Sequence, residues 1–291
     1  QERAALISLF NATGGSQWTS RMNWTTNAPE NQWWGLTIEG GHVTAIVLQN
    51  NNLVGTIPPE IGNFPALRIL DLSGNKLTGG IPSEIGGLTT LQQLLLQSNQ
   101  LSGSIPLNLY NLTNLERLYI SFNQLTGNIS GDISKMKSLQ KLNLSYNQLS
   151  GNLTFRIGRL GSSLTELNLS SNQFNSFIPD SIGNLVLLTD LYLDNNLFSG
   201  TIPNAIGNLL NLKTLNLANN NLRGIIPIEI FSLTKLEKLI LSSNQFLSQD
   251  LPDEIGNLVN LQNLDIRSCN FKGEIPESIS NLSKLNSFFI S

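Results

Sequence analysis

Among the side chains that serve as nucleophile or base in catalysis, this chain of 291 residues has a single histidine and a single cysteine. Acyl transfer needs a nucleophile, a base and an orienting group within hydrogen-bond reach, whereas the only histidine, His42, and the only cysteine, Cys269, lie far apart in the sequence. Glu166 and Asp190 have the chemistry of an acid–base pair, but the sequence predicts no cleft around them. The residues therefore predict a protein that is not an enzyme.

The composition and the net charge of the chain also argue against metals, nucleic acid and membranes as partners. One cysteine and one histidine do not supply the four ligands of a typical zinc site. Glu166, Asp190 and Asp194 are candidate calcium ligands, but their spacing does not arrange the six or more oxygens that calcium takes, so this site stays a minor alternative. A net charge of −3 without a basic block disfavours nucleic acid. No apolar run approaches the ~20 residues of a membrane span. We expect no cofactor, no metal and no membrane insertion in this segment.

A repeat of about two dozen residues runs through most of the chain and determines its elements. The frame L-x-x-L-x-L-x-x-N-x-L appears at residues 67–77 and again at residues 91–101. Its asparagine position recurs in steps of 24 residues, with two steps of 25. The residues at this position form the predicted asparagine ladder: Asn51, Asn75, Asn99, Asn123, Asn147, Asn172, Asn196, Asn220, Asn244 and, in the tenth place, Cys269.

Each fixed residue of the frame has a physical role in a coiled chain. Alternating leucines place successive side chains on opposite faces of a short strand, apolar inward and variable outward. Neighbouring strands must stack in parallel, because no single coil buries its apolar interior alone. The ladder amides turn inward and bond the backbone where it bends, and Cys269 is interpreted as a weaker, buried substitute. A G-x-I-P segment and an E-I-G-N-L stretch then predict a bend and a short helical turn on the outer side.

The run LxxLxLxxNxLxGxIPxxIGNL resembles the plant-type class of leucine-rich repeat proteins, which includes receptor-kinase ectodomains and wall-enzyme inhibitors. The resemblance covers residues 43–291, with ten full repeats and a partial eleventh that is truncated at its carboxy-terminal end. It implies an α/β fold: a curved, right-handed leucine-rich repeat solenoid with a parallel inner sheet, short helical or 3₁₀ turns outside and an amino-terminal helical cap. It also implies a secreted or cell-surface, receptor-like module that binds a protein, peptide or glycan on the concave sheet.

Residues 1–42 are expected to form the cap. Residues 2–10 predict an amphipathic helix with Leu6, Leu9 and Phe10 on one side. All four tryptophans lie in this segment, where they are expected to cover the first coil. Land-plant caps usually carry a cysteine pair, whereas Asn31 and Ile38 occupy those places here. A cap without cysteines suggests a microbial or algal member of the class.

The outward positions of the inner sheet predict the ligand site. Tyr119, Phe122 and Tyr146 bring outward aromatic residues together in repeats four and five, and such residues on a rigid surface are favoured anchors. A column of charges beside them is either a ladder of cross-strand ion pairs or the rim of the site. Ser130 and Thr154 replace the usual proline in the same repeats, and local breaks in a pattern often mark function. The predicted ligand-binding residues are Arg117, Tyr119, Phe122, Lys141, Tyr146, Glu166, Asp190, Tyr192 and Asp194.

Two other functions remain open from the sequence. One is a structural or adhesive spacer of a cell-surface protein that self-associates, with a homodimer formed through the apolar end left uncovered at Ser291. The other is ice or crystal binding by a column of hydroxyls, namely Thr78, Ser102, Thr126, Ser150 and Ser199. The leading hypothesis is an extracellular recognition module.

Overall fold

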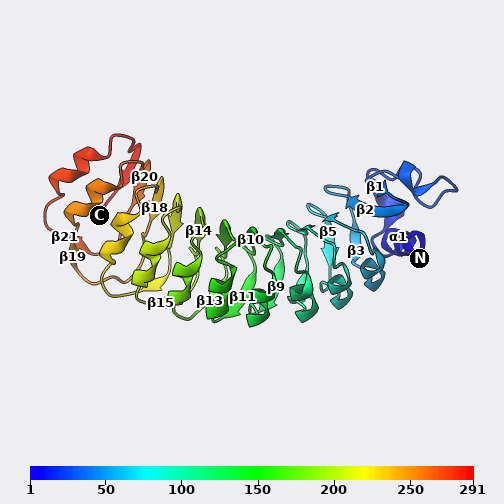
Figure 1. Ribbon diagram of the computed structural model, residues 1–291, viewed down its shortest axis with the longest axis horizontal. Helices are drawn as coiled ribbons and strands as arrows, with labels where there is room; N and C mark the ends of the chain where they lie inside the picture. Colours follow the sequence, from blue (N-terminus) through cyan, green and yellow to red (C-terminus); the bar gives the residue numbers. More distant parts are fainter. The chain divides into compact units, whose positions relative to one another are not determined.

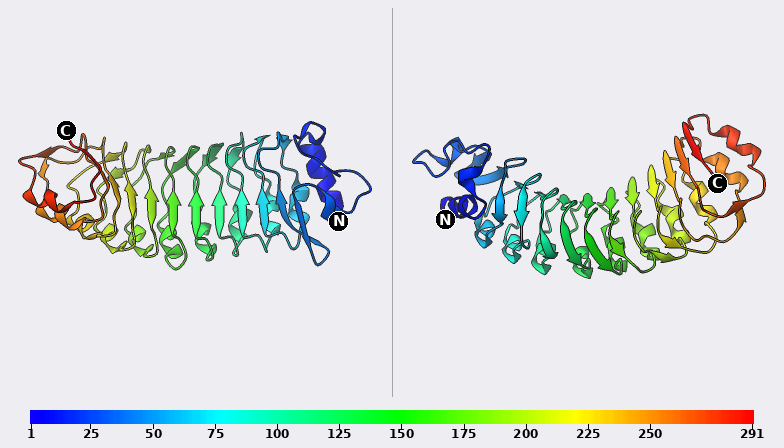
Figure 2. Two further views of the ribbon diagram at one scale, coloured as in Figure 1. Left: turned by 90° about the horizontal axis from the view of Figure 1, so that it is seen from above. Right: turned by 180° about the vertical axis from the view of Figure 1, so that it is seen from behind.

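The computed structural model describes residues 1–291, which divide into two compact units, residues 1–148 and 149–291. Both units are leucine-rich repeat solenoids, as the sequence predicts: each coil contributes one strand to a sheet and a 3₁₀ helix to the opposite side (Figure 1). Figure 2 shows the strands of each unit side by side, with the short helices along the other edge of the coils.

The main sheet of the first unit follows chain order. Strand β1 pairs antiparallel with β2, and each later strand pairs in parallel with the one before it. Leu70, Leu94 and Leu118 lie opposite one another and are at most 1% exposed, which confirms the predicted common interior. Each such leucine contributes roughly 2 kcal/mol of apolar burial. The strands are β1 (Leu36–Glu39), β2 (His42–Val47), β4 (Ile69–Asp71), β6 (Gln93–Leu95), β8 (Arg117–Tyr119) and β10 (Lys141–Asn143).

The Gly-Pro segments of the first unit form a second, smaller set of strands. Strand β3 (Val54–Thr56) pairs in parallel with β5 (Lys76–Thr78), and β7 (Ser102–Ser104) pairs with β9 (Gln124–Gly127). A 3₁₀ helix follows each of them, usually directly after a proline whose φ angle starts the turn. These helices are η3 (Pro59–Asn63), η4 (Ser83–Gly87), η5 (Leu107–Asn111) and η6 (Gly131–Lys135).

The cap begins with helix α1 (Glu2–Ala12), which buries Leu6 and Leu9 as predicted, together with Ala5, whereas Phe10 is only half-buried. Trp18, Trp24 and Trp33 are buried, whereas Trp34 is 36% exposed, so three of the four tryptophans pack inside. Two 3₁₀ turns follow the helix, η1 (Gly15–Gln17) and η2 (Glu30–Gln32). The antiparallel hairpin β1–β2 was not predicted. Its turn, Gly40-Gly41, has positive φ at both residues, which is the geometry of a tight hairpin turn.

The second unit repeats this plan. Leu167, Leu191, Leu215, Leu239 and Leu264 lie in parallel register inside it and are fully buried. Its main strands are β12 (Glu166–Asn168), β14 (Asp190–Tyr192), β16 (Thr214–Asn216), β18 (Lys238–Ile240), β20 (Asn263–Asp265) and β22 (Ser287–Phe289). Its smaller strands are β13 (Gln173–Phe174), β15 (Ser199–Gly200), β17 (Asn221–Leu222), β19 (Gln249–Asp250) and β21 (Phe271–Lys272), and β11 (Gln148–Gly151) begins at the last residue of the first unit.

The two one-residue insertions lie in different parts of a coil. Helix η7 (Phe155–Leu160) has six residues, where the other outer helices of the second unit have five, and it absorbs the first insertion. The second falls in residues 245–252, between β17 and β19, which belong to two separate small sheets. The remaining outer helices are η8 (Asp180–Asn184), η9 (Asn204–Asn208), η10 (Ile228–Ser232), η11 (Asp253–Asn257) and η12 (Glu277–Asn281). None of the helices has the length and apolar character needed to cross a bilayer.

Candidate functional site

The ladder asparagines bond the backbone of two neighbouring coils. The Oδ1 atom of Asn75 accepts hydrogen bonds from the backbone N–H groups of Asn51 (2.9 Å) and Leu53 (3.0 Å). Its Nδ2 group donates to the carbonyls of Leu48 and Leu72, both at 2.9 Å. Burying these four backbone groups without partners would be costly, so the ladder amide has a structural task.

Cys269 takes the same place with weaker bonding. Its thiol donates to the carbonyl of Leu241 at 3.2 Å, and a thiol is a poor acceptor for backbone N–H groups. Burial raises the pKa of the Cys269 thiol to about 12, with a smaller contribution from the charge of Asp265. The neutral, buried thiol lacks the low pKa of a reactive cysteine.

The residue before each ladder position has a left-handed backbone. All ten of these residues have φ between 51° and 65°. Glycine, asparagine and serine occupy eight of the ten places, and Phe122 and Tyr146 occupy the other two. A bulky side chain in this region is a backbone outlier, and such outliers cluster at functional sites. The ten residues, which we call the left-handed column, are Asn50, Gly74, Ser98, Phe122, Tyr146, Ser171, Asn195, Asn219, Ser243 and Ser268.

Phe122 and Tyr146 stack on each other at the surface of the first unit. Their ring centroids are 4.2 Å apart and their planes differ by 9°. The residues are 52% and 50% exposed, so each ring packs on its neighbour and still faces solvent. Tyr119, the third predicted aromatic residue, is half-buried on β8, in register with Asn143 of β10. The structure thus brings the predicted pair into direct contact.

The charged column carries like charges on neighbouring strands within each unit. Arg117 lies in register with Lys141 in the first unit, and Glu166 lies in register with Asp190 in the second. Like charges directly opposite each other destabilise a sheet. Within either unit, these neighbours do not form a ladder of opposite charges, and their role in a ligand site stays a prediction.

In the second unit, carboxylates surround Tyr192. Burial is the main cause that raises the pKa of Tyr192, and the negative charges of Asp190, Glu166 and Asp194 add to it. Burial also raises the pKa of Asp194, whose carboxylate accepts a hydrogen bond from the Asn195 amide at 2.6 Å. No three histidine, cysteine or acidic side chains gather closely enough to hold a metal ion.

Several outward side chains of the strands accept a hydrogen bond from the backbone N–H group two residues later in the chain. The Oδ1 atom of Asp71 accepts from the backbone N–H (3.0 Å) and hydroxyl (2.6 Å) of Ser73. Asn143, Asn168, Asn216 and Asp265 accept in the same way from the residue two places later. Sequence reasoning missed this role, although the spacing Asp/Asn-x-Ser is the signal of such a turn.

Ser130 and Thr154 stand where most other coils have a proline, and the structure explains both residues. Both side chains cap the following 3₁₀ helix, because Ser130 Oγ accepts from the N–H of Asp132 and Thr154 Oγ1 from that of Arg156. The backbone N–H of Ser130, which a proline would lack, donates to the buried hydroxyl of Tyr110 at 3.2 Å. These substitutions therefore do not by themselves point to a ligand site.

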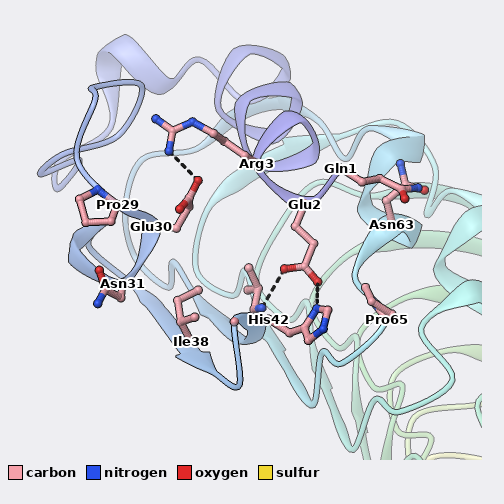
Figure 3. A pocket seen from close by; sticks show the side chains of 12 residues that line it. Gln1, Glu2, Arg3, Pro29, Glu30, Asn31, Ile38, His42, Asn63 and Pro65 are labelled. Atoms are coloured by element: carbon pink, nitrogen blue, oxygen red, sulfur yellow. Dashed lines mark hydrogen bonds and ion pairs between the residues drawn. The ribbon is translucent and has the colours of Figure 1, made fainter.

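The cap of the first unit contains a cavity of about 550 Å³ that the sequence did not predict (Figure 3). Glu2 bonds His42 (3.1 Å) and the N–H of Val43 (3.0 Å) on one side, and Arg3 bonds Glu30 on the other. The guanidinium of Arg3 lowers the pKa of Glu30. Asn31 and Ile38, the two places where land-plant caps usually carry cysteines, also line the cavity. Its charged groups are bonded to one another.

Family models match most of the chain. A leucine-rich repeat model matches residues 41–101 and 188–246, and a model of two repeat copies matches residues 113–156. A single-repeat model matches residues 163–185, 235–258 and 260–282. No catalytic family is among these matches, and no curated protein matches the chain.

Solved structures share the fold over nearly the whole chain. The ectodomain of the Arabidopsis thaliana receptor kinase GASSHO1/SCHENGEN3, in complex with CASPARIAN STRIP INTEGRITY FACTOR 2, is 35% identical with a TM-score of 0.93, over 98% of this chain and 34% of that one. The Arabidopsis receptor kinase HAESA, with the peptide hormone IDA and the co-receptor SERK1, is 29% identical with a TM-score of 0.87, over 100% of this chain and 53% of that one.

A plant ice-binding protein is also similar, at 27% identity and a TM-score of 0.81, over 100% of this chain and 94% of that one. The chain spans only 34% to 53% of the length of the two receptor chains above.

Proposed function

Because this chain belongs to the leucine-rich repeat family, we propose that it is a non-enzymatic, receptor-like recognition module, secreted or at the cell surface, whose ligand is a peptide rather than a folded protein or a glycan. The likeness to the receptor kinase HAESA, which was solved with the peptide hormone IDA, supports this assignment. The single observation that carries it is the exposed stack of Phe122 and Tyr146 on the first unit.

The binding surface of the first unit combines an apolar anchor with positive charge. Arg117 and Lys141 lie side by side on β8 and β10, Tyr119 follows on β8, and the aromatic stack lies beyond the strand ends. The strands are held by the asparagine ladder, so little ordering is needed on binding. Exposed aromatic rings on such a scaffold supply most of the binding energy in many interfaces. Glu166, Asp190, Tyr192 and Asp194 form a separate, acidic surface on the second unit, suited to a cationic part of a ligand.

The test is capture of peptides from a phage-displayed random library on the immobilised protein. We expect enrichment of a defined set of peptides. The triple variant Tyr119→Ala, Phe122→Ala and Tyr146→Ala should lose at least tenfold in affinity for the selected peptides. Its thermal midpoint should stay near that of the parent protein, because two of the three side chains are exposed.

A matched control removes exposed apolar side chains from outer turns instead. The variant Val186→Ala, Leu187→Ala and Leu210→Ala deletes side chains that are 48%, 42% and 60% exposed, and it should bind the selected peptides normally. Unchanged affinity in the aromatic variant would contradict the proposed site. Failure to enrich any peptide, together with concentration-dependent association in light scattering, would favour the spacer function.

Ice binding is a second candidate, favoured by the likeness to a plant ice-binding protein. The hydroxyl column expected from the repeat does not form, because the smaller sheet pairs residues that are 22 positions apart. Ser102 therefore lies opposite Gln124, and Ser199 lies opposite Asn221. Only short rows remain, such as Thr56 beside Thr78 and Ser104 beside Thr126. Thermal hysteresis in a nanolitre osmometer would support this candidate, and its absence would remove it.

A further inference from the structure

The aromatic pair occupies backbone positions that suit aromatic residues poorly. Phe122 and Tyr146 both have φ of 53°, where the other repeats have glycine, asparagine or serine. A left-handed backbone is strained for a bulky side chain and persists only where something else compensates for it. Burial does not compensate here, because both residues are about half exposed, at 52% and 50%. Backbone hydrogen bonds to the next coil, which Phe122 and Asn123 donate as the equivalent residues of other coils do, hold the conformation, and the two rings stack on each other at the surface.

One face of the Phe122 ring has no ring partner. Tyr146 covers the face on its own side at 4.2 Å. On the other side lies the preceding coil, whose Ser98 N–H bonds the carbonyl of Ser121 and whose Asn99 N–H bonds that of Phe122. The equivalent residues there and one coil further are Ser98, which is exposed, and Gly74. Neither side chain is large enough to cover a six-membered ring.

From this geometry, and resting on the proposed function, we propose that an aromatic side chain of an acidic peptide stacks on the free face of Phe122, above Ser98. The ligand ring then becomes the third ring of a column that already has two nearly parallel members. Adjacent coils lie ~4.8 Å apart, which is close to the spacing of stacked rings. Ser98 and Gly74 leave the space that this third ring fills.

The positive charges near the aromatic stack indicate that the peptide also carries an acidic side chain. Arg117 and Lys141 each lie five positions before a member of the aromatic stack, on the same two coils. Five residues of extended chain span at most about 16 Å. In an extended peptide, an acidic side chain that reaches these cations therefore lies within about five residues of the aromatic one.

Filling the space with a ring of the protein itself is the sharpest test. The variant Ser98→Tyr places a third aromatic ring in the left-handed column, and Ser98→Ala is its matched control. Selection from the phage-displayed library on the parent protein should enrich acidic peptides with an aromatic residue nearby. Ser98→Tyr should weaken these peptides at least tenfold and remove the aromatic preference from a fresh selection. Ser98→Ala should bind them normally.

A second pair of variants tests whether the strain is retained for binding. Phe122→Asn with Tyr146→Asn relieves the backbone, so the thermal midpoint should stay level or rise while affinity for the aromatic peptides falls at least tenfold. The matched control, Ser243→Phe with Ser268→Tyr, installs a ring pair at equivalent places of the second unit, where φ is 60° and 53°. It should lower the thermal midpoint and capture no aromatic peptides through that site.

The outcomes separate this inference from the proposed function. Peptides that bind through Tyr119 and Arg117 without any aromatic preference would overturn the third-ring site and leave peptide recognition intact. Equal binding by Ser98→Tyr would do the same. Binding to a glycan array that Ser98→Tyr abolishes, without any peptide selection, would keep the ring site but overturn the peptide as its occupant. No peptide and no glycan binding would overturn both proposals.

Discussion

The two units build the same coil from the same frame, yet they fill its outward positions with opposite chemistry. The first unit has Arg117 beside Lys141, and the second has Glu166 beside Asp190. The left-handed column carries an aromatic pair in the first unit, and only serine or asparagine in the second. Since the frame is shared, these differences are not needed for folding. They are the reason why we propose an aromatic, acidic ligand for the first unit and not for the second.

The two units also differ at one kind of inward position, the ladder residues. Asparagine fills every ladder place of the first unit, whereas the second unit ends its ladder with Cys269. Asn75 bonds five backbone groups of two coils, and Cys269 has two bonds from a weaker donor. Tolerance of the substitution in the second unit suggests that its last coils depend less on the ladder.

The largest effect should come from removing a ladder amide in the first unit. The variant Asn75→Ala leaves the N–H groups of Asn51 and Leu53 and the carbonyl of Leu48 without a partner, whereas the Leu72 carbonyl keeps its bond from Asn99. At roughly 1 kcal/mol or more for each buried, unsatisfied group, the cost is about 3 kcal/mol. Cys269→Ala should cost about 1 kcal/mol, because it removes only weak bonds and a small buried side chain. Urea unfolding measures both, and equal losses would contradict the difference between the units.

Alkaline pH should destabilise both units through different groups. Burial raises the pKa of Tyr110 in the first unit and of Cys269 in the second to about 12. Both groups ionise earlier in the unfolded chain, so stability is fully present below pH 9 and is lost as pH rises toward 12. Each group contributes at most about 1.4 kcal/mol per pH unit. The free energy of unfolding should fall less steeply with pH between pH 10 and 12 in Tyr110→Phe, and from pH 9 in Cys269→Ala. If both variants showed the same pH dependence of unfolding as the parent protein, the assignment to these groups would be wrong.

The pairing of Ser130 with Tyr110 makes a local test within the first unit. Ser130 has φ −65° and ψ 149°, close to the prolines that occupy this place in other coils, so Ser130→Pro fits the backbone. The proline removes the N–H that bonds the Tyr110 hydroxyl, and that hydroxyl is then buried without its donor. Ser130→Pro alone should cost about 2 kcal/mol, and Tyr110→Phe alone about 1 kcal/mol.

The double variant completes this cycle. Ser130→Pro with Tyr110→Phe removes both the donor and the acceptor of the bond between these residues, and proline stiffens the unfolded chain. The N–H of Asp132 loses its Ser130 Oγ acceptor in the double variant as it does in Ser130→Pro alone, so that loss cancels in the cycle. It should therefore be more stable than the sum of the single changes implies, by about 1 kcal/mol. Strict additivity in urea unfolding would show that the hydrogen bond does not couple the two residues.

The sequence predicts the solenoid well because leucine spacing alone determines which side chains face inward. The spacing was enough to predict that Leu70, Leu94 and Leu118 share one interior. The repeat pattern was also enough to predict the short helices on the outer side. The hairpin β1–β2 was missed, although Gly40-Gly41 between two short alternating runs was its signal. The contact of Ser130 with Tyr110 joins adjacent coils, and no spacing rule reports it.

The candidate site was predicted only in part. The repeat frame predicts which aromatic and charged residues lie at outward positions, but it does not predict which of them bind a ligand. The left-handed φ of Phe122 and Tyr146 is a property of the backbone, invisible in a list of outward positions. The capping role of Asn143 and Asn168 likewise depends on a hydrogen bond two residues along. The predicted residue set itself stays a prediction until binding is measured.

The smallest effect should come from making one position of the second unit resemble the first. Asp194 stands where the first unit has Ser121 and Ser145, and burial raises the pKa of its carboxyl. A raised carboxyl pKa means that ionisation costs more in the folded state, so the penalty is present at neutral pH and disappears as pH falls below the unfolded value near 4. Asp194→Ser should therefore stabilise the protein at pH 7 by less than about 1 kcal/mol, and not at pH 3. Asp265, three coils further along, provides the opposite control, because the hydrogen bonds that it accepts from Arg267 lower the pKa of its carboxyl and its contribution is lost in acid. If Asp194→Ser were equally stabilising at both pH values, the gain would come from packing, and the charge difference between the units would have no part in it.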